Sequence, residues 1–437
     1  MKIAIALIAL LVLMIIGTPI PLAFIGSAAA IVFLGGYDPG FLLPYGASKM
    51  NSIILLTIPL FVIAGQIMNR GGIGEQLIGS VEKLVGRIKG GLGVVAVVTC
   101  GIFGAISGSS SATLSAIGGI ILPKMQKDGY SVGFSCSLLA SAGVLGTLIP
   151  PSALMILYAW IGNQSVLRSF LAGVIPGIIL IILMSVINLI YAKNNPNMHA
   201  KTKEEIALMK AARKRVDEQG RRVFGPIPAL IMPVIILGSI YGGILTATES
   251  AAVSVIYAIP VGIWVYRSLN WKTLKEALVA AGSASGVIMS MLFAISILSR
   301  MYTMENLPAK ILALLSAISD NKNVILLIIN FFLIILGMLM DDTSAILLAT
   351  PLLLPIMTEI GVDPIQFAGI LGVNLGLGCV TPPTAPLLYL SGRIGKAELK
   401  DMLKPTLILI AFAWIPTLLL TTYVPQITLF LPNLLVK

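Results

Sequence analysis

Apolar runs of roughly 14 to 25 residues recur from one end of this 437-residue chain to the other. A helix needs about 20 mainly apolar residues to cross the hydrocarbon core of a bilayer. With 57% hydrophobic residues, 11% charged residues and a mean hydropathy of +1.00, the chain holds more apolar surface than a soluble core can bury. The sequence therefore predicts an all-α polytopic membrane protein.

Ten of the runs are interpreted as membrane spans. They cover about 3–16, 20–36, 52–69, 131–160, 165–192, 226–245, 248–268, 276–300, 365–392 and 405–431. The first run is similar to the core of a signal peptide, but it has no small-residue cleavage pattern and another span follows at once. We therefore expect it to be retained.

Two further runs, at about 92–123 and 324–357, are interrupted in the middle by polar residues. The interruptions read SGSSSAT at 107–113 and MDDTSAI at 340–346. Lipid cannot pair the backbone groups of a polar turn, so such a turn must be buried in protein or face water. Each run is predicted to be a re-entrant helical hairpin that enters the membrane and turns back.

The segment 193–225 separates the two halves of the chain and is rich in Lys and Arg. Positive loops stay on the cytoplasmic side, so this linker is predicted to be cytoplasmic. The net charge of +11 falls in short loops of this kind, which argues against a nucleic-acid partner. The stretch 70–90 places Leu77, Ile78, Val81 and Leu84 at helical spacing, which is typical of an amphipathic helix on the membrane surface.

The two halves share motifs at an offset of about 232 residues. The pairs are Gly104 with Gly337, Ser109–Ala112 with Asp342–Ala345, and Pro150–Ala153 with Pro382–Ala385. Each repeat, 1–192 and 226–437, would hold five spans and one hairpin. An odd number of crossings inverts the second copy, so we predict an inverted-topology repeat, an architecture of transporters.

Within each repeat, a span is interrupted at a Pro-Pro-Ser/Thr motif: the span at 131–160 at Pro150–Pro151, and the span at 365–392 at Pro382–Pro383. Proline removes a backbone donor and ends the preceding helix. Exposed carbonyls and hydroxyls at such a break can bind sodium, while half-helix N-termini face an anion. A proline kink with small packing residues is the alternative for a single break. The matched pairs favour a binding site.

Three acidic residues, Glu249, Asp341 and Asp342, fall within apolar segments, where an unpaired charge costs about 2.5–3.5 kcal/mol. Asp342 aligns with Ser109 of the other hairpin and is predicted to be a cation ligand. Asp341 is either a second functional acid or a helix N-cap, and Glu249 is interpreted as a capping carboxylate.

Other polar and aromatic residues near span ends receive structural interpretations. Arg300 and Arg393 are expected to extend to the membrane interface. The four tryptophans are expected to form part of an interfacial belt. They are Trp160, Trp264, Trp271 and Trp414.

The paired hairpins, the SGSSSAT tip, the two Pro-Pro-Ser/Thr-Ala breaks and the segment Thr246–Ala252 together resemble the large membrane subunit of TRAP transporters, within the ion-transporter superfamily. The resemblance covers essentially the whole chain and favours the sialic-acid branch, with dicarboxylate uptake as the alternative. It implies sodium-driven transport in which a transport domain moves as an elevator against a scaffold. It also implies two partners, a small four-span membrane subunit and a periplasmic substrate-binding protein.

The resemblance also implies site residues. The first sodium site would use Gly108, Ser109, Ser111, Gly146 and Thr147, and the second Asp342, Thr343, Gly378 and Thr381. The organic anion would lie near Ser110, Ser344, Pro151 and Thr384. No organic cofactor is implied, and the location is the bacterial cytoplasmic (inner) membrane.

Three alternatives remain open. A stand-alone proton-coupled exchanger would use Asp341, Asp342 or Glu249 as its proton carrier. An intramembrane serine enzyme would use Ser109–Ser111, although the chain has a single histidine, His199, in its most polar stretch. A non-transporting scaffold subunit would leave the polar breaks without a purpose.

Overall fold

The computed structural model describes residues 2–86, 88–199 and 227–436. These ranges form helices and their connections, without a β-strand, which confirms the all-α expectation. The predicted cytoplasmic linker, 193–225, lies outside the described residues from position 200 onward.

The helices fall on either side of this linker. In the first half they are α1 (Lys2–Ile15), α2 (Ile20–Gly35), η1 (Pro39–Phe41), α3 (Leu42–Met50), η2 (Ile53–Leu56), α4 (Thr57–Arg70), α5 (Ile73–Val85), α6 (Gly91–Ser107), α7 (Ser110–Lys127), α8 (Val132–Gly143), α9 (Leu145–Leu148), α10 (Ala153–Ile161), α11 (Val166–Ala172) and α12 (Val174–Asn194). In the second half they are α14 (Ile227–Tyr241), α15 (Ala247–Pro260), η3 (Val261–Val265), α16 (Trp271–Met304), α17 (Leu307–Ile318), α18 (Lys322–Leu339), α19 (Asp342–Glu359), α20 (Pro364–Val380), α21 (Pro386–Gly395), α22 (Leu399–Leu409), η4 (Ile410–Trp414), α23 (Ile415–Tyr423) and α24 (Gln426–Leu435).

Six helical segments within the described ranges are long and apolar enough to cross a membrane, and the bent pair Val132–Leu148 and Ala153–Ile161 would make a seventh. This is fewer than the ten expected spans. In the expected spans at 3–16, 20–36, 226–245 and 365–392, the apolar helices that begin each span are shorter than 18 residues. One of the six long helices, Lys322–Leu339, belongs instead to the expected hairpin at 324–357. Between α1 and α2, Gly17 has a φ of +87° and Pro19 lacks a backbone donor, so one continuous helix cannot form there.

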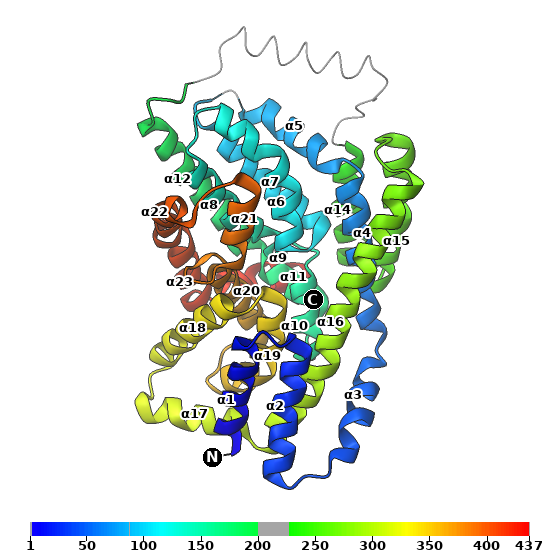
Figure 1. The fold of residues 1–437 in the computed structure, drawn as a ribbon, viewed down its shortest axis with the longest axis vertical. Coiled ribbons are helices and arrows are strands. Elements are labelled where there is room, and N and C mark those ends of the chain that lie inside the picture. Colours follow the sequence, from blue (N-terminus) through cyan, green and yellow to red (C-terminus); the bar gives the residue numbers. More distant parts are fainter. Residues whose placement is uncertain (1, 87, 200–226, 437) are drawn as a thin grey trace.

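Apart from α5 and α17, the α-helices sort into two groups. One group, here called the frame, contains α1–α4 and α14–α16, where α16 packs against α2, α3 and α4 and α15 packs against α4. The frame runs along the right-hand side of Figure 1 through α3, α4, α15 and α16. The other group, here called the hairpin group, contains α6–α12 and α18–α24. The groups meet mainly where α4 contacts α6 and where α16 contacts α19.

Within the hairpin group, the halves of the chain are interleaved. The α6–α7 pair occupies the upper part of Figure 1, and the α18–α19 pair the lower part. Helix α21, which follows the second Pro-Pro break, packs against α7, and α10, which follows the first break, packs against α19. Each hairpin therefore contacts the interrupted helix of the opposite half.

Helix α5 packs against α6 and α7 through buried Ile73, Leu77, Ile78 and Val81. Leu84, in the last turn of α5, has an exposed side chain.

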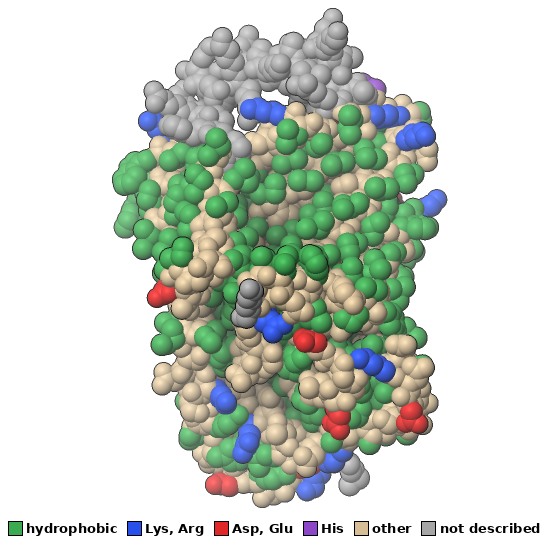
Figure 2. Space-filling view, turned by 180° about the vertical axis from the view of Figure 1, so that it is seen from behind, with side chains coloured by type: hydrophobic (Ala, Val, Ile, Leu, Met, Phe, Trp, Pro, Cys, Tyr) green, Lys and Arg blue, Asp and Glu red, His purple; other side chains and the backbone are tan. Residues whose placement is uncertain are grey.

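Large apolar side chains are exposed over much of the surface. Hydrophobic groups cover most of the upper and middle face in Figure 2, as expected of a surface that contacts lipid. Trp264 and Trp271 are exposed, as belt residues would be. The expectation is wrong for Trp414, which is fully buried against Gly376, because η4 turns its ring toward α20.

Candidate ion and anion site

The first hairpin turns at Gly108 and Ser109. Helix α6 ends at Ser107, and Gly108 has a φ of +61°, a conformation that favours glycine. Ser109 is the N-cap of α7, where its hydroxyl accepts a hydrogen bond from the Ala112 amide at 3.5 Å. A glycine and a serine therefore reverse the chain and leave the N-terminus of α7 at the tip.

The second hairpin turns at Met340 and Asp341. Asp341 is the N-cap of α19, where its carboxylate accepts hydrogen bonds from the amides of Thr343 at 3.1 Å and Ser344 at 3.3 Å. The Ser344 hydroxyl donates to the same carboxylate. Of the two interpretations of Asp341, the structure therefore has the N-cap.

These caps correct the alignment of the two tips. Ser109 and Asp341 hold the same N-cap position, so the counterpart of Asp342 is Ser110, not Ser109. The sequence comparison pairs Ser109 with Asp342 because the following Ser-Ala matches are one residue out of register with the caps.

The two tips meet at this corresponding pair. The Ser110 hydroxyl donates a hydrogen bond to Asp342 Oδ2 at 2.6 Å, across 232 positions of sequence. Asp342 Oδ1 accepts from the Thr343 amide at 2.9 Å. Among the described residues, no Lys or Arg forms a salt bridge with Asp341 or Asp342. The N-termini of α7 and α19 thus converge on a carboxylate that has no cationic side chain beside it.

The first interrupted helix is tied to the first tip. Helix α9 ends at Leu148 and α10 begins at Ala153, with a bend of 47° between the flanking helices. The Ser152 hydroxyl donates to the Thr147 carbonyl at 2.5 Å. The Ala153 amide donates to the Gly108 carbonyl at 3.3 Å. The break therefore leaves polar backbone paired within the protein and against the hairpin turn.

The second interrupted helix is tied to the second hairpin. Helix α20 ends at Val380 and α21 begins at Pro386. The Thr384 hydroxyl donates to the Met338 carbonyl at the end of α18. The Thr381 hydroxyl instead donates to the Leu377 carbonyl of its own helix at 2.6 Å.

Glycine pairs bring each hairpin close to its interrupted helix. A Cβ on Gly104 would lie 2.6 Å from the Gly146 Cα, and one on Gly378 would lie 2.6 Å from the Gly337 Cα. On Gly146 it would lie 2.6 Å from the Ser109 carbonyl oxygen. The same glycine-on-glycine contact thus occurs in both halves.

The structure brings the residues named for the first sodium site near one another. The Ser109 and Ser111 hydroxyls are 3.3 Å apart, and Gly146 packs against Ser109. The Thr147 hydroxyl donates to the Val144 carbonyl at 2.9 Å. In the second set, Asp342 and Thr343 share a tip, while Gly378 packs on α18 through Gly337.

The residues named for the anion lie in two places. Ser110, at the first tip, is hydrogen-bonded to Asp342 of the second tip. Ser344 donates to Asp341 within the second tip. Pro151 lies at Gly108 and Thr384 at Met338, so each of these two stays with the hairpin of its own half.

Sequence reasoning missed three contributors. The Ser152 hydroxyl donates a hydrogen bond across the first break, and the Met338 carbonyl accepts one from the Thr384 hydroxyl. The Met291 sulfur of α16 lies 3.5 Å from the Ser344 hydroxyl. Ser152 and Thr384 belong to the repeated Pro-Pro-Ser/Thr motif, which was the available signal. Met291 carries no such signal, because its contact joins the frame to the hairpin group.

The third acid of the apolar segments, Glu249, lies at the start of α15. Its carboxylate accepts from the Thr246 amide at 2.7 Å and the Thr246 hydroxyl at 2.8 Å, and its amide donates to Thr246 Oγ1. This is a complete capping box at the start of α15. Arg300 lies over the Tyr45 ring at 5.6 Å, between α16 and α3.

A polar crevice of about 620 Å³ opens between the two groups of helices. Frame residues from α3 and α16, with Lys49 among them, form one wall. Trp160 of α10 and the following Asn163 and Gln164 form the other. The described residues contain no cluster of three or more His, Cys, Asp or Glu side chains that could hold a metal. A cation at the tips would therefore depend on the carboxylates of Asp341 and Asp342 and on neutral oxygens.

Fold and site together define a class: a helical membrane protein in which two hairpin tips and two interrupted helices meet inside the hairpin group. The fold is similar to that of the YdaH transporter of Alcanivorax borkumensis, with a TM-score of 0.56, 12% identity, and coverage of 88% of this chain and 87% of that one. Residues 7–427 match the family described as "Tripartite ATP-independent periplasmic transporter, DctM component", and the chain belongs to this family.

Curated relatives carry several substrate names. The chain is 34% identical to the C4-dicarboxylate TRAP transporter large permease protein of Pseudomonas aeruginosa, covering 87% of this chain and 86% of that protein. It is 32% identical to the sialic acid TRAP transporter large permease protein of Vibrio cholerae, over 96% and 95%. It is also 32% identical to the isethionate TRAP transporter permease protein of Oleidesulfovibrio alaskensis. That match covers 95% of this chain but 64% of the relative. These relatives are transport proteins, not enzymes.

Proposed function

We propose that the chain is the large permease subunit of a sodium-coupled, binding-protein-dependent uptake system for an organic anion. The observation that carries this proposal is the meeting of the two hairpin tips at Ser110 and Asp342. There, the Asp342 carboxylate, which forms no salt bridge with any Lys or Arg in the described ranges, lies beside hydroxyls and the N-termini of α7 and α19.

Sodium suits this arrangement because it is bound by oxygen ligands at broken helices. The first sodium would lie among Gly108, Ser109, Ser111, Gly146 and Thr147, and the second among Asp342, Thr343, Gly378 and Thr381. The anion would lie between them, near Ser110 and Ser344, where the two helix N-termini offer partial positive charge. Pro151 and Thr384 would border this space.

Coupling to sodium gives the transport its direction. Each positive charge that enters contributes about 2.3 kcal/mol per 100 mV of membrane potential. Two sodium ions entering with one anion can therefore drive accumulation of that anion.

The movement we propose is an elevator motion within an inverted-repeat fold. The recurrence of a hairpin, an interrupted helix and a glycine contact in each half supports the repeat. The separation of the frame from the hairpin group supports a scaffold and a moving transport domain. The Met291–Ser344 contact lies on the boundary where the two would slide.

For the substrate we propose sialic acid, with a dicarboxylate as the second candidate. The relatives' names include isethionate, C4-dicarboxylate and sialic acid, which are all organic anions. The relatives therefore support an organic anion as the substrate more strongly than they support sialic acid in particular. A small four-span membrane subunit and a periplasmic binding protein complete the proposed system. Its location would be the bacterial cytoplasmic membrane, with the 193–225 linker on the cytoplasmic side.

The test is reconstitution of the chain with its small subunit and binding protein in liposomes. Uptake of labelled sialic acid is compared with uptake of labelled succinate, in an inward sodium gradient and in choline. We expect uptake that requires sodium and the binding protein. Uptake that follows a proton gradient and ignores sodium would favour the proton-coupled exchanger instead.

A further inference from the structure

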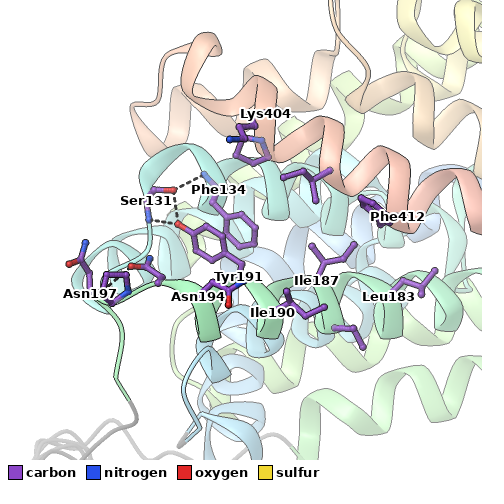
Figure 3. Close-up of a pocket in the computed structure, with 15 residues that line it drawn as sticks. Ser131, Phe134, Leu183, Ile187, Ile190, Tyr191, Asn194, Asn197, Lys404 and Phe412 are labelled. Carbon is purple, nitrogen blue, oxygen red and sulfur yellow. Dashed lines mark hydrogen bonds between the residues drawn. The ribbon is translucent and has the colours of Figure 1, made fainter.

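A groove that the transport site does not use runs along the outer side of the hairpin group. It has a volume of about 1000 Å³ and lies between α12 on one side and α8, α22 and η4 on the other. Figure 3 shows Leu183, Ile187 and Ile190 of α12 along one wall and Phe412 on the other. Several lining side chains are exposed, among them Ile190 at 56% and Phe412 at 65%.

One end of this groove is polar. Lys404 extends from α22 at this end, opposite Ser131 and the asparagines that end α12 (Figure 3). Tyr191 donates a hydrogen bond to Ser131 at 3.0 Å, and its ring stacks on Phe134 with centroids 3.7 Å apart. This stacked pair closes the polar end with a rigid surface.

Among the described residues that line the groove, Lys404 is the one with a charged side chain. No carboxylate among the described residues forms a salt bridge with it. By contrast, Lys400, one turn earlier on α22, pairs with Glu398 at 2.7 Å. The polar end therefore presents a positive charge that no described carboxylate pairs with, together with amide and hydroxyl donors.

The groove also has the depth of one bilayer leaflet. From Leu183 to Asn194, α12 rises about 17 Å at ~1.5 Å per residue. Half of a hydrocarbon core is about 15 Å thick. An acyl chain of a lipid lying in the groove would thus cross one leaflet, and the lipid's head group would lie at Lys404.

From these features we propose that the groove binds one anionic phospholipid. An acyl chain would pack along Leu183, Ile187 and Ile190, and the phosphate would contact Lys404 and the Ser131 hydroxyl. Basic pockets between membrane helices bind anionic head groups in this way. The transported anion does not suit the groove, because apolar side chains line its walls.

Native mass spectrometry of the full chain in detergent tests the proposal, using dioleoyl phosphatidylglycerol and dioleoyl phosphatidylcholine as probes. We expect one retained phosphatidylglycerol and at least fivefold less retained phosphatidylcholine. Lys404→Gln should lower phosphatidylglycerol retention at least fivefold. Lys400→Gln is the matched control on the same helix and should leave retention unchanged.

A second variant tests the apolar part of the groove. Ile190→Trp narrows the groove from an exposed position and should reduce retention of both lipids. Val279→Trp, at an exposed position of α16, should not. Unchanged phosphatidylglycerol retention in Lys404→Gln or Ile190→Trp would overturn the proposal. So would loss of the bound lipid when the small membrane subunit is added, because a protein helix would then occupy the groove.

Discussion

At the scale of single residues, the site depends on a few short polar side chains that do two tasks at once. Ser109 and Asp341 cap helices, and the residue after each cap, Ser110 and Asp342, faces the other tip. Capping explains why the residues at positions 109 and 341 are a serine and an aspartate. It leaves Asp342 as the acid that is not needed to begin its helix.

Asp342→Asn removes the negative charge but keeps an oxygen at the tip. We expect sodium-dependent uptake to fall at least tenfold, because the amide cannot neutralise a bound cation. Asp320→Asn, at an exposed position before α18, should leave uptake unchanged. Sodium should also raise the melting temperature of the wild type more than that of Asp342→Asn. Equal uptake in both variants would remove Asp342 from the ion site.

Gly146→Ala tests the close backbone contact at the first tip. The added Cβ would lie 2.4 Å from Thr113 Oγ1 and 2.6 Å from the Ser109 carbonyl. Such overpacking costs about 1–3 kcal/mol. Gly119→Ala is the control, because a Cβ there meets no atom within 4 Å. Thermal unfolding in detergent should show a lower melting temperature for Gly146→Ala alone.

At the scale of elements, helix ends decide which acids are structural. In the capping box of α15, Glu249 Oε2 accepts hydrogen bonds from the Thr246 amide and hydroxyl, and the Glu249 amide donates to Thr246 Oγ1. A second helix-end contact joins Tyr37, after α2, to Glu305, after α16, through a hydrogen bond of 2.9 Å. Neither contact involves the hairpin tips.

Glu249→Gln separates capping from proton transport. Glutamine can also form a capping box, so we expect sodium-dependent uptake to persist within about twofold. Thr246→Ala, which removes the cap hydroxyl, should cost about 1 kcal/mol of stability without changing the ion dependence of uptake. If Glu249→Gln abolished transport, the proton-coupled alternative would gain support.

The Tyr37–Glu305 contact should make stability depend on pH. The Tyr37 hydroxyl holds the pKa of the Glu305 carboxyl below its ordinary value. Stabilisation is therefore present above the ordinary glutamate pKa of about 4.3 and is lost as pH falls through the lowered value. Wild type should melt at a higher temperature than Tyr37→Phe at pH 7, and this difference should shrink below pH ~4. A difference that stays constant across this range would contradict the assignment.

At the scale of the whole molecule, the frame and the hairpin group share fewer contacts than each has within itself. The buried boundary includes Met291 against Ser344, whereas Thr57 and Thr248, hydrogen-bonded at 2.6 Å, lie within the frame. The Met291–Ser344 pair therefore reports on motion between the two groups, and the Thr57–Thr248 pair reports on motion inside the frame.

Cross-linking tests the proposed elevator. In Met291→Cys/Ser344→Cys, Hg²⁺ should join frame to hairpin group and stop the remaining uptake, and a thiol reagent should restore it. In Thr57→Cys/Thr248→Cys the same treatment should leave uptake largely intact, because both cysteines lie in the frame. Transport that continues through a verified Met291–Ser344 link would rule out relative motion at this boundary.

The sequence by itself determined the all-α membrane class, the two polar tips and the two Pro-Pro breaks, because hydropathy, proline and capping residues act over a few neighbouring positions. The repeat offset also revealed which motifs correspond, to within one residue at the tips. It could not show that Ser110 meets Asp342, that Trp414 is buried or that Met291 reaches Ser344. Those contacts join positions 53 to 232 residues apart, or depend on which face a helix turns inward, and only packing of the folded chain decides them.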